Sequence, residues 1–160
     1  MTENSSHMKK YSNFQFGWVV VIVFLIVIQW ITFAYRFQWG NNPIPKPAYI
    51  VFLVLFFGTL LFFYGITVIV DEKQIIIKLG IGFYKRKIDL SSIKSVESIT
   101  YPSYYGYGIR LIHNGILYNV SGKHAIKLKF KNTRRVILIG TNDWDNLKAA
   151  IEEKIKRINA

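Results

Sequence analysis

Two long hydrophobic runs dominate the first half of the sequence. Residues 16–35 read FGWVVVIVFLIVIQWITFAY and residues 48–70 read AYIVFLVLFFGTLLFFYGITVIV, and neither run contains a charged residue. About twenty helical residues are enough to cross the roughly 30 Å hydrocarbon core of a bilayer. The pattern therefore predicts two transmembrane helices, at about 16–35 and 48–68.

The segments around these runs are short or unpatterned. Residues 36–47 (RFQWGNNPIPKP) carry three prolines and a Gly-Asn-Asn turn, so the two helices should form an antiparallel hairpin, the domain unit 16–65. Lys9 and Lys10 precede the first run as they would in a cleaved signal peptide, but the run is too long and no small-residue cleavage pattern follows it. Residues 1–15 are polar, and we expect a flexible tail there.

The flanks of the hairpin predict how it sits in the membrane. Aromatic residues that favour the headgroup level lie near the ends of the runs, and we expect these to be anchors: Trp18, Tyr35, Trp39, Tyr49 and Tyr64. Basic residues are sparse in the connecting loop and denser before the first run and after the second. The positive-inside rule then predicts a two-span protein of the cell membrane with both termini in the cytoplasm.

Residues 66–160 change to short alternating segments separated by turn residues, which is typical of β-strands. Residues 66–70 either finish the second helix or form a first strand. Further strands are expected at 74–79, 83–88, 93–100, 108–112, 116–120, 125–131 and 134–139. Residues 142–158 repeat apolar positions at helical spacing, with acidic residues in the first turn and basic residues in the last.

Together these elements predict an α+β membrane protein. About seven strands followed by one helix, whose apolar stripe needs a partner, favour an antiparallel curved sheet or partly open barrel capped by the C-terminal helix. This domain would cover residues 66–160.

Charge adds a preference for anionic partners. The chain has 21 Lys and Arg against 9 Asp and Glu, a net charge of +12. A domain held beneath an anionic leaflet gains from such charge, although topology and solubility alone would also explain it. Nucleic-acid binding is not expected, because no groove-reading or RNA-stacking motif accompanies the charge.

Two groups of residues are candidates for contact with a protein partner or anionic lipid headgroups. The basic group comprises Lys85, Arg86 and Lys87 together with one face of a strand, Lys127, Lys129 and Lys131. The aromatic group lies in the segment YPSYYGY at residues 101–107 and comprises Tyr104, Tyr105 and Tyr107. Exposed aromatic clusters mark interfaces, and packing over the sheet is the alternative for this segment.

Motifs for catalysis, cofactors and metals are missing from the sequence. GILYNVSGKH at 115–124 superficially resembles a phosphate loop, but the spacing is too long and His124 stands where Ser or Thr should be. The histidines share no metal-ligand spacing, and the absence of cysteine excludes disulfides and thiolate metal sites. We therefore expect no enzyme activity, no cofactor and no metal site.

The order of parts resembles the bacterial pleckstrin-homology-like (PH-like) domains attached to membrane hairpins. The residues that carry the resemblance are ITVIVDEKQIIIKLGIGFYKRKIDLSSIKSVES, YYGYGIR, LYNVSGKHAIKLKF and VILIGT, between residues 66 and 141. The resemblance implies a seven-stranded sheet capped by a C-terminal helix and no shared catalytic chemistry. Related domains often bind phosphoinositides through a basic first hairpin loop, but that loop is acidic here (Asp71-Glu72-Lys73), so this specificity is not carried over.

Two functions of different kinds follow from these features. The first is a membrane-anchored, non-catalytic interaction module that binds a protein partner or an anionic lipid surface at the cytoplasmic face. The second is a structural or regulatory subunit of a membrane complex that acts through its transmembrane helices. The spans contain no ionisable side chain of the kind that ion and proton pathways need.

Overall fold

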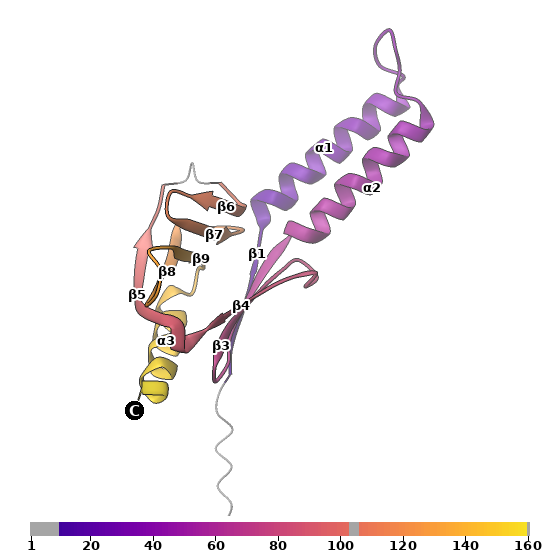
Figure 1. The fold of residues 1–160 in the computed structure, drawn as a ribbon. Helices are drawn as coiled ribbons and strands as arrows, with labels where there is room; N and C mark the ends of the chain where they lie inside the picture. The colour runs from indigo at the N-terminus through magenta and orange to yellow at the C-terminus, as the bar shows by residue number, and fades with distance from the viewer. Residues whose placement is uncertain (1–9, 103–105, 160) are drawn as a thin grey trace, which may run out of the picture.

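The chain folds into a pair of long helices and a β-rich part built from two sheets and a third helix (Figure 1). The structure, a computed structural model, describes residues 10–102 and 106–159. It confirms the predicted α+β class with two long apolar helices.

Helices α1 (Trp18–Arg36) and α2 (Lys46–Phe63) lie side by side and extend away from the sheets (Figure 1). They contact each other through the rings of Phe24 and Phe56 and through the parallel rings of Tyr35 and Tyr49, whose centroids are 4.2 Å apart. No residue of either helix is buried, although both helices are predominantly apolar. Both helices are long and apolar enough to cross a membrane.

The first sheet joins the helices to the rest of the fold. Its four antiparallel strands follow in chain order: β1 (Tyr11–Phe16), β2 (Gly65–Val70), β3 (Gln74–Leu79) and β4 (Tyr84–Asp89). Strand β1 precedes α1 and β2 follows α2, with Phe16 opposite Gly65 in the register. The backbone N–H of Gly17 donates to the carbonyl of Tyr64 at 2.7 Å, so the first turn of α1 and the last turn of α2 meet at one strand pair.

The second sheet has five strands in the order β5-β8-β9-β7-β6. The strands are β5 (Ile93–Thr100), β6 (Gly108–Ile112), β7 (Gly115–Asn119), β8 (His124–Phe130) and β9 (Val136–Gly140). A short 3-10 turn (Leu90–Ser92) leads into β5, and Asp89 accepts a hydrogen bond from the backbone N–H of Ser91 there. Strands β7 and β9 pair in parallel, and the other pairs are antiparallel.

One hydrophobic core unites both sheets and the C-terminal helix α3 (Trp144–Asn159). Alternate residues of β2 and β3 face residues of β7, β8 and β9, and Leu147 and Ile151 of α3 are wholly buried among them. Helix α3 contacts β5, β8 and β2, so it covers part of both sheets. The predicted packing of this helix against the sheet is therefore confirmed.

Most strands begin and end near their predicted positions. Strands β3, β5 and β6 match the predictions at 74–79, 93–100 and 108–112, and the hairpins of β3 with β4, β6 with β7 and β8 with β9 are present. The described residues form nine strands rather than about seven, and the two sheets do not join into a closed barrel.

Two boundaries differ from the predictions. Strand β1 covers residues 11–15, which were expected within a flexible tail, and residue 16, which was expected to begin the first helix. The partner of this strand lies beyond the helical hairpin, and Gln15 is buried where an apolar residue would have been recognised. The second helix, expected to reach residue 68, ends at Phe63. The apolar residues after it fit a helix or a strand equally, and pairing on both sides with β1 and β3 decides for a strand. A Cβ at Gly65 would lie 2.4 Å from the Phe14 ring, so any other residue at the start of this strand would have to displace that ring.

Candidate functional site

The lysine face of β8 has the predicted direction but includes a carboxylate from the neighbouring strand. Ile126 and Leu128 are buried, so Lys127 and Lys129 project from the opposite side of the sheet. Glu97 of β5 stands opposite Lys127 and forms an ion pair with Lys129. The hydrogen bond from Lys129 holds the pKa of the Glu97 carboxyl below its usual range. These lysines therefore surround an acidic group and are only partly available to an anionic partner.

The basic run on β4 divides between two faces. Arg86 stands opposite the buried Ile77, so it lies on the inward face of the first sheet, whereas Lys85 and Lys87 lie on the outward face. All three side chains are exposed, as is Lys131 beyond the end of β8. The predicted basic residues therefore form no single patch, and Arg86 lies toward the second sheet.

Arg86 borders a cleft between the edges of the two sheets, which we call the arginine cleft. Its basic side chains are Arg86 from β4 and Arg134 and Arg135 from the loop between β8 and β9. Leu111 of β6, His113 in the turn that follows it and the ring of Phe130 also line the cleft, which has a volume of about 670 Å³. No Asp or Glu is among the described residues that line it.

The three guanidinium groups of the arginine cleft are available to a ligand. Within residues 10–102 and 106–159, no ion pair or hydrogen bond joins their guanidinium nitrogens to another side chain; Arg135 uses only its backbone N–H, which donates to Thr133 Oγ1 at 3.2 Å. Guanidinium forks bind phosphate and carboxylate oxygens in pairs. Arginines beside apolar side chains therefore suit an anionic ligand that also has an apolar part.

The buried side chain of Tyr118 lies near Arg86 and is hydrogen-bonded to a second, half-buried tyrosine. The hydroxyls of Tyr84 and Tyr118 are 2.9 Å apart. Burial, followed by the hydrogen bond with Tyr84, raises the pKa of Tyr118, and the positive charge of Arg86 acts in the opposite direction. Tyr118 therefore stays neutral at physiological pH and adds no negative charge beside Arg86.

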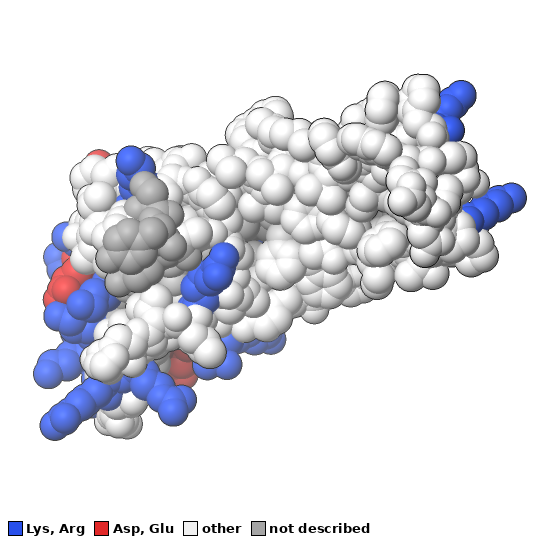
Figure 2. All heavy atoms as spheres, turned by 90° about the horizontal axis from the view of Figure 1, so that it is seen from above, with Lys and Arg blue, Asp and Glu red and all other residues white. Residues whose placement is uncertain are grey.

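The predicted membrane anchors lie in two clusters at opposite ends of the helix pair. Trp18 and Tyr64 lie at the end near the sheets, and Tyr35, Trp39 and Tyr49 lie at the end with the loop. The ring of Phe16 joins the first cluster, 4.6 Å from that of Trp18 between centroids. Lysine and arginine also gather at the two ends of the molecule, on either side of an uncharged helical surface (Figure 2).

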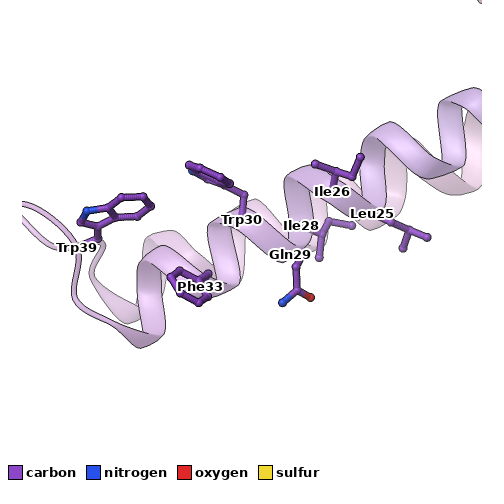
Figure 3. Close-up of a pocket in the computed structure, with 7 residues that line it drawn as sticks. All are labelled: Leu25, Ile26, Ile28, Gln29, Trp30, Phe33 and Trp39. Carbon is purple, nitrogen blue, oxygen red and sulfur yellow. The ribbon is translucent and has the colours of Figure 1, made fainter.

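A groove runs along the outside of α1, away from α2. It has a volume of about 790 Å³, and its main lining residues are Leu25, Ile26, Gln29, Trp30, Phe33 and Trp39. Figure 3 shows the Gln29 amide as the one amide group among the side chains drawn there. The rings of Trp30 and Trp39 lie 5.5 Å apart between centroids and form one end of the groove.

The segment of residues 101–107 packs against the second sheet at its first residue, Tyr101. Tyr101 is buried against Leu117, Ala125 and Leu138, and burial raises its pKa to about 12. Tyr107 is half-buried, and the predicted contact residues Tyr104 and Tyr105 lie outside the described residues.

Sequence reasoning missed most of the arginine cleft. Arg134 and Arg135 were expected at the charged start of a strand, but β9 begins at Val136 and leaves them in a loop. Adjacent arginines in a turn are a visible signal, yet their position beside Arg86 depends on how the two sheets pack. Among the described residues, no group of three His, Asp or Glu side chains is placed to hold a metal ion.

Comparisons with protein-family models, with curated proteins and with solved structures found no match to this chain.

Proposed function

We propose that this chain is a membrane-anchored binding protein whose β-rich part binds a phosphate-bearing ligand in the arginine cleft. The single observation that carries the proposal is a set of three guanidinium groups around one cleft that, among the described residues, have no side-chain partner and no carboxylate beside them in the lining. The volume of about 670 Å³ lies in the usual range for small-ligand sites. The exposed Leu111 and the Phe130 ring provide the apolar side of the site.

Membrane insertion of α1 and α2 is part of this proposal. Their predominantly apolar, unburied surfaces would form a very large exposed patch in water, and rings at both ends favour the headgroup level. Because β1 and β2 pair directly, both ends of the helical hairpin lie on one side, which favours two crossings over one. The basic flanks favour the cytoplasm for that side.

A labelling experiment tests this orientation. The chain has no cysteine, so single cysteines at Asn41, in the loop between the helices, and at Asn132, in an exposed turn of the β-rich part, report cleanly. An impermeant thiol reagent should label Asn41→Cys in intact cells and Asn132→Cys only after lysis. Labelling of Asn132→Cys in intact cells would show that the orientation is reversed.

The resemblance to PH-like domains stays a proposal as well. A helix that follows the last strand and packs on both sheets supports it. The nine strands, with β7 and β9 in parallel, depart from the seven that the resemblance implies.

Ligand binding can be measured with the full chain in nanodiscs of neutral phosphatidylcholine. The probes are inorganic phosphate, short-chain phosphatidate and, as a neutral comparison, short-chain phosphatidylcholine. We expect phosphatidate to bind more tightly than phosphate, because it also offers acyl chains to Leu111 and Phe130. Equal affinity for both would identify a free phosphate compound rather than a lipid as the source of the ligand.

Two variants with the same change in net charge separate a specific site from general attraction. Changing Arg86, Arg134 and Arg135 to Gln should weaken phosphatidate binding by about a hundredfold, since charge-assisted hydrogen bonds contribute roughly 1.5–3 kcal/mol each before discounting for exposure. Changing Lys127, Lys129 and Lys131 to Gln should have a several-fold effect at most. Equal losses in the two variants, or no binding of either phosphate probe, would contradict the proposed site.

A further inference from the structure

The side-chain amide of Gln29 has an unusual position on α1. Gln29 is exposed on the side away from α2, and within the described parts of the chain no hydrogen bond reaches its amide. Other polar groups of the helices have partners: Thr32 donates to the carbonyl of Ile28 and Thr59 to that of Leu55, each at 2.8 Å. Gln29 therefore needs a partner from outside the chain.

Lipid and water cannot easily supply this partner. Gln29 lies seven residues before Arg36, the last residue of α1, which corresponds to about 10 Å along the helix axis. This is farther than a glutamine side chain extends, so the amide stays within the hydrocarbon once α1 spans the bilayer. An amide in hydrocarbon without a hydrogen-bond partner is costly, and polar side chains in this position stabilise contacts between helices.

The residues around Gln29 form a continuous seam. Ile22, Ile26, Gln29 and Phe33 follow one another at spacings of four, three and four residues, and all are exposed on α1. This is the spacing of helices that pack side by side at a small crossing angle. The groove of about 790 Å³ beside this seam, closed at one end by Trp30 and Trp39, provides space for side chains of an opposing helix.

We propose that two copies of this chain associate in the membrane through the seam of α1, with their Gln29 amides hydrogen-bonded to each other. A carboxamide both donates and accepts, so it is complementary to itself. A second copy inserted in the same direction presents the same amide at the same depth, and a two-fold axis along the membrane normal brings the two together. Another protein would need a polar group at this depth by coincidence. The inference rests on the proposed membrane insertion and is independent of the arginine cleft.

Energy transfer between labelled copies measures the association. The purified full chain carries Asn132→Cys, labelled with donor or acceptor, and is reconstituted in phosphatidylcholine vesicles at a series of protein-to-lipid ratios. Gln29→Leu should weaken association by roughly tenfold to a hundredfold, because it removes two reciprocal hydrogen bonds. Thr59→Val is the matched control: it removes a hydroxyl that bonds to its own helix, and association should be unchanged.

Cysteine cross-linking then tests which face of the helix pair is used. Ile26→Cys lies in the seam and Leu55→Cys lies on α2, and both native side chains are 60% exposed. Oxidation should link copies through residue 26 and not through residue 55. Equal linking at both positions, or an unchanged affinity in Gln29→Leu, would overturn the inference.

Resistance to a carbonate wash separates failure of this inference from failure of the proposed insertion. Protein that is removed by the wash is not inserted, which would contradict the proposed function. Protein that resists the wash but stays monomeric at every ratio, or that associates only after a membrane extract is added, would overturn pairing with a second copy.

Discussion

Lys154 offers a sharp test of how α3 is held against the sheets. Its side chain is 7% exposed, and its ammonium lies 2.5 Å from Oε1 of Glu72, in the turn between β2 and β3. Two unit charges about 4 Å apart attract by roughly 4 kcal/mol at an effective dielectric constant of 20. Because Glu72 is 45% exposed, water screens part of this attraction. We expect Glu72→Gln to lower the free energy of unfolding by about 2 kcal/mol, since it leaves a buried charge unpaired.

The partner substitution should behave differently. Lys154→Met removes the buried charge, keeps most of the length of the side chain and leaves Glu72 able to contact water. We expect the free energy of unfolding to stay within about 1 kcal/mol of the wild type, or to rise. Glu153→Gln is the control on the same helix: it breaks an ion pair with Arg157 in which both side chains are more than half exposed, and it should cost less than about 0.5 kcal/mol.

Denaturant unfolding in detergent micelles can measure these differences. Replacing Trp18, Trp30 and Trp39 by Phe leaves Trp144 as the only tryptophan. Trp144 is the first residue of α3, and its ring stacks on that of His124 in β8. Its fluorescence therefore reports on the β-rich part alone. If Glu72→Gln costs no more than Glu153→Gln, or if Lys154→Met is as harmful as Glu72→Gln, the account of a buried charge that depends on its partner is wrong.

Three further results are expected. Ile151→Ala should lower the unfolding free energy by about 2–5 kcal/mol, because Ile151 is wholly buried. Ile158→Ala changes a side chain on the same helix that is 40% exposed, and it should lower the unfolding free energy by less than about 1 kcal/mol. Equal losses would contradict the packing of α3. Gly80→Ala should lower the unfolding free energy by about 2 kcal/mol or more, because φ is +54° and the new Cβ would lie 2.0 Å from the Leu61 carbonyl oxygen. A smaller loss in denaturant unfolding would contradict this account of Gly80. Burial raises the pKa of Tyr101 to about 12 from an unfolded value near 10, so its contribution to stability is complete below pH 10 and is lost as pH rises to 12; Tyr101→Phe should flatten this part of the unfolding profile.

The strands that sequence reasoning located share a physical property: their signal is local. In β3 the residues Ile75, Ile77 and Leu79 alternate with polar or half-buried positions, and turn residues bound the segment. The helical spacing of Leu147 and Ile151 in α3 is equally local. The spacing of apolar residues and the turn residues on either side are sufficient to locate such elements from the sequence.

The elements that were missed depend on distant partners. Strand β1 has a polar, buried residue at Gln15, whose amide donates to the Ser121 carbonyl at 2.7 Å and to its hydroxyl at 2.6 Å, so its inward face is not marked by hydrophobicity. The arginine cleft combines one arginine of β4 with two from a loop some 50 residues later, and only the packing of the sheets brings them together. Gln29 differs from β1 and the arginine cleft, because a single amide in an apolar run can be seen in the sequence. The sequence does not show which face of α1 this amide occupies.

The pairing of β1 with β2 has a consequence for biosynthesis. Phe16 leaves the ribosome about 50 residues before its partner Gly65, a delay of about 3–10 s at ordinary rates of translation. During this interval β1 has no strand to pair with, and both apolar helices must be synthesised and placed before the first sheet can close. If only one helix were inserted, β1 and β2 would emerge on opposite sides of the membrane and the sheet would lose its edge strand. If the two helices span a membrane as proposed, completion of this sheet would act as a check on insertion. A nascent chain with the wrong number of crossings would expose an unpaired strand edge to the proteases and chaperones that remove misassembled proteins.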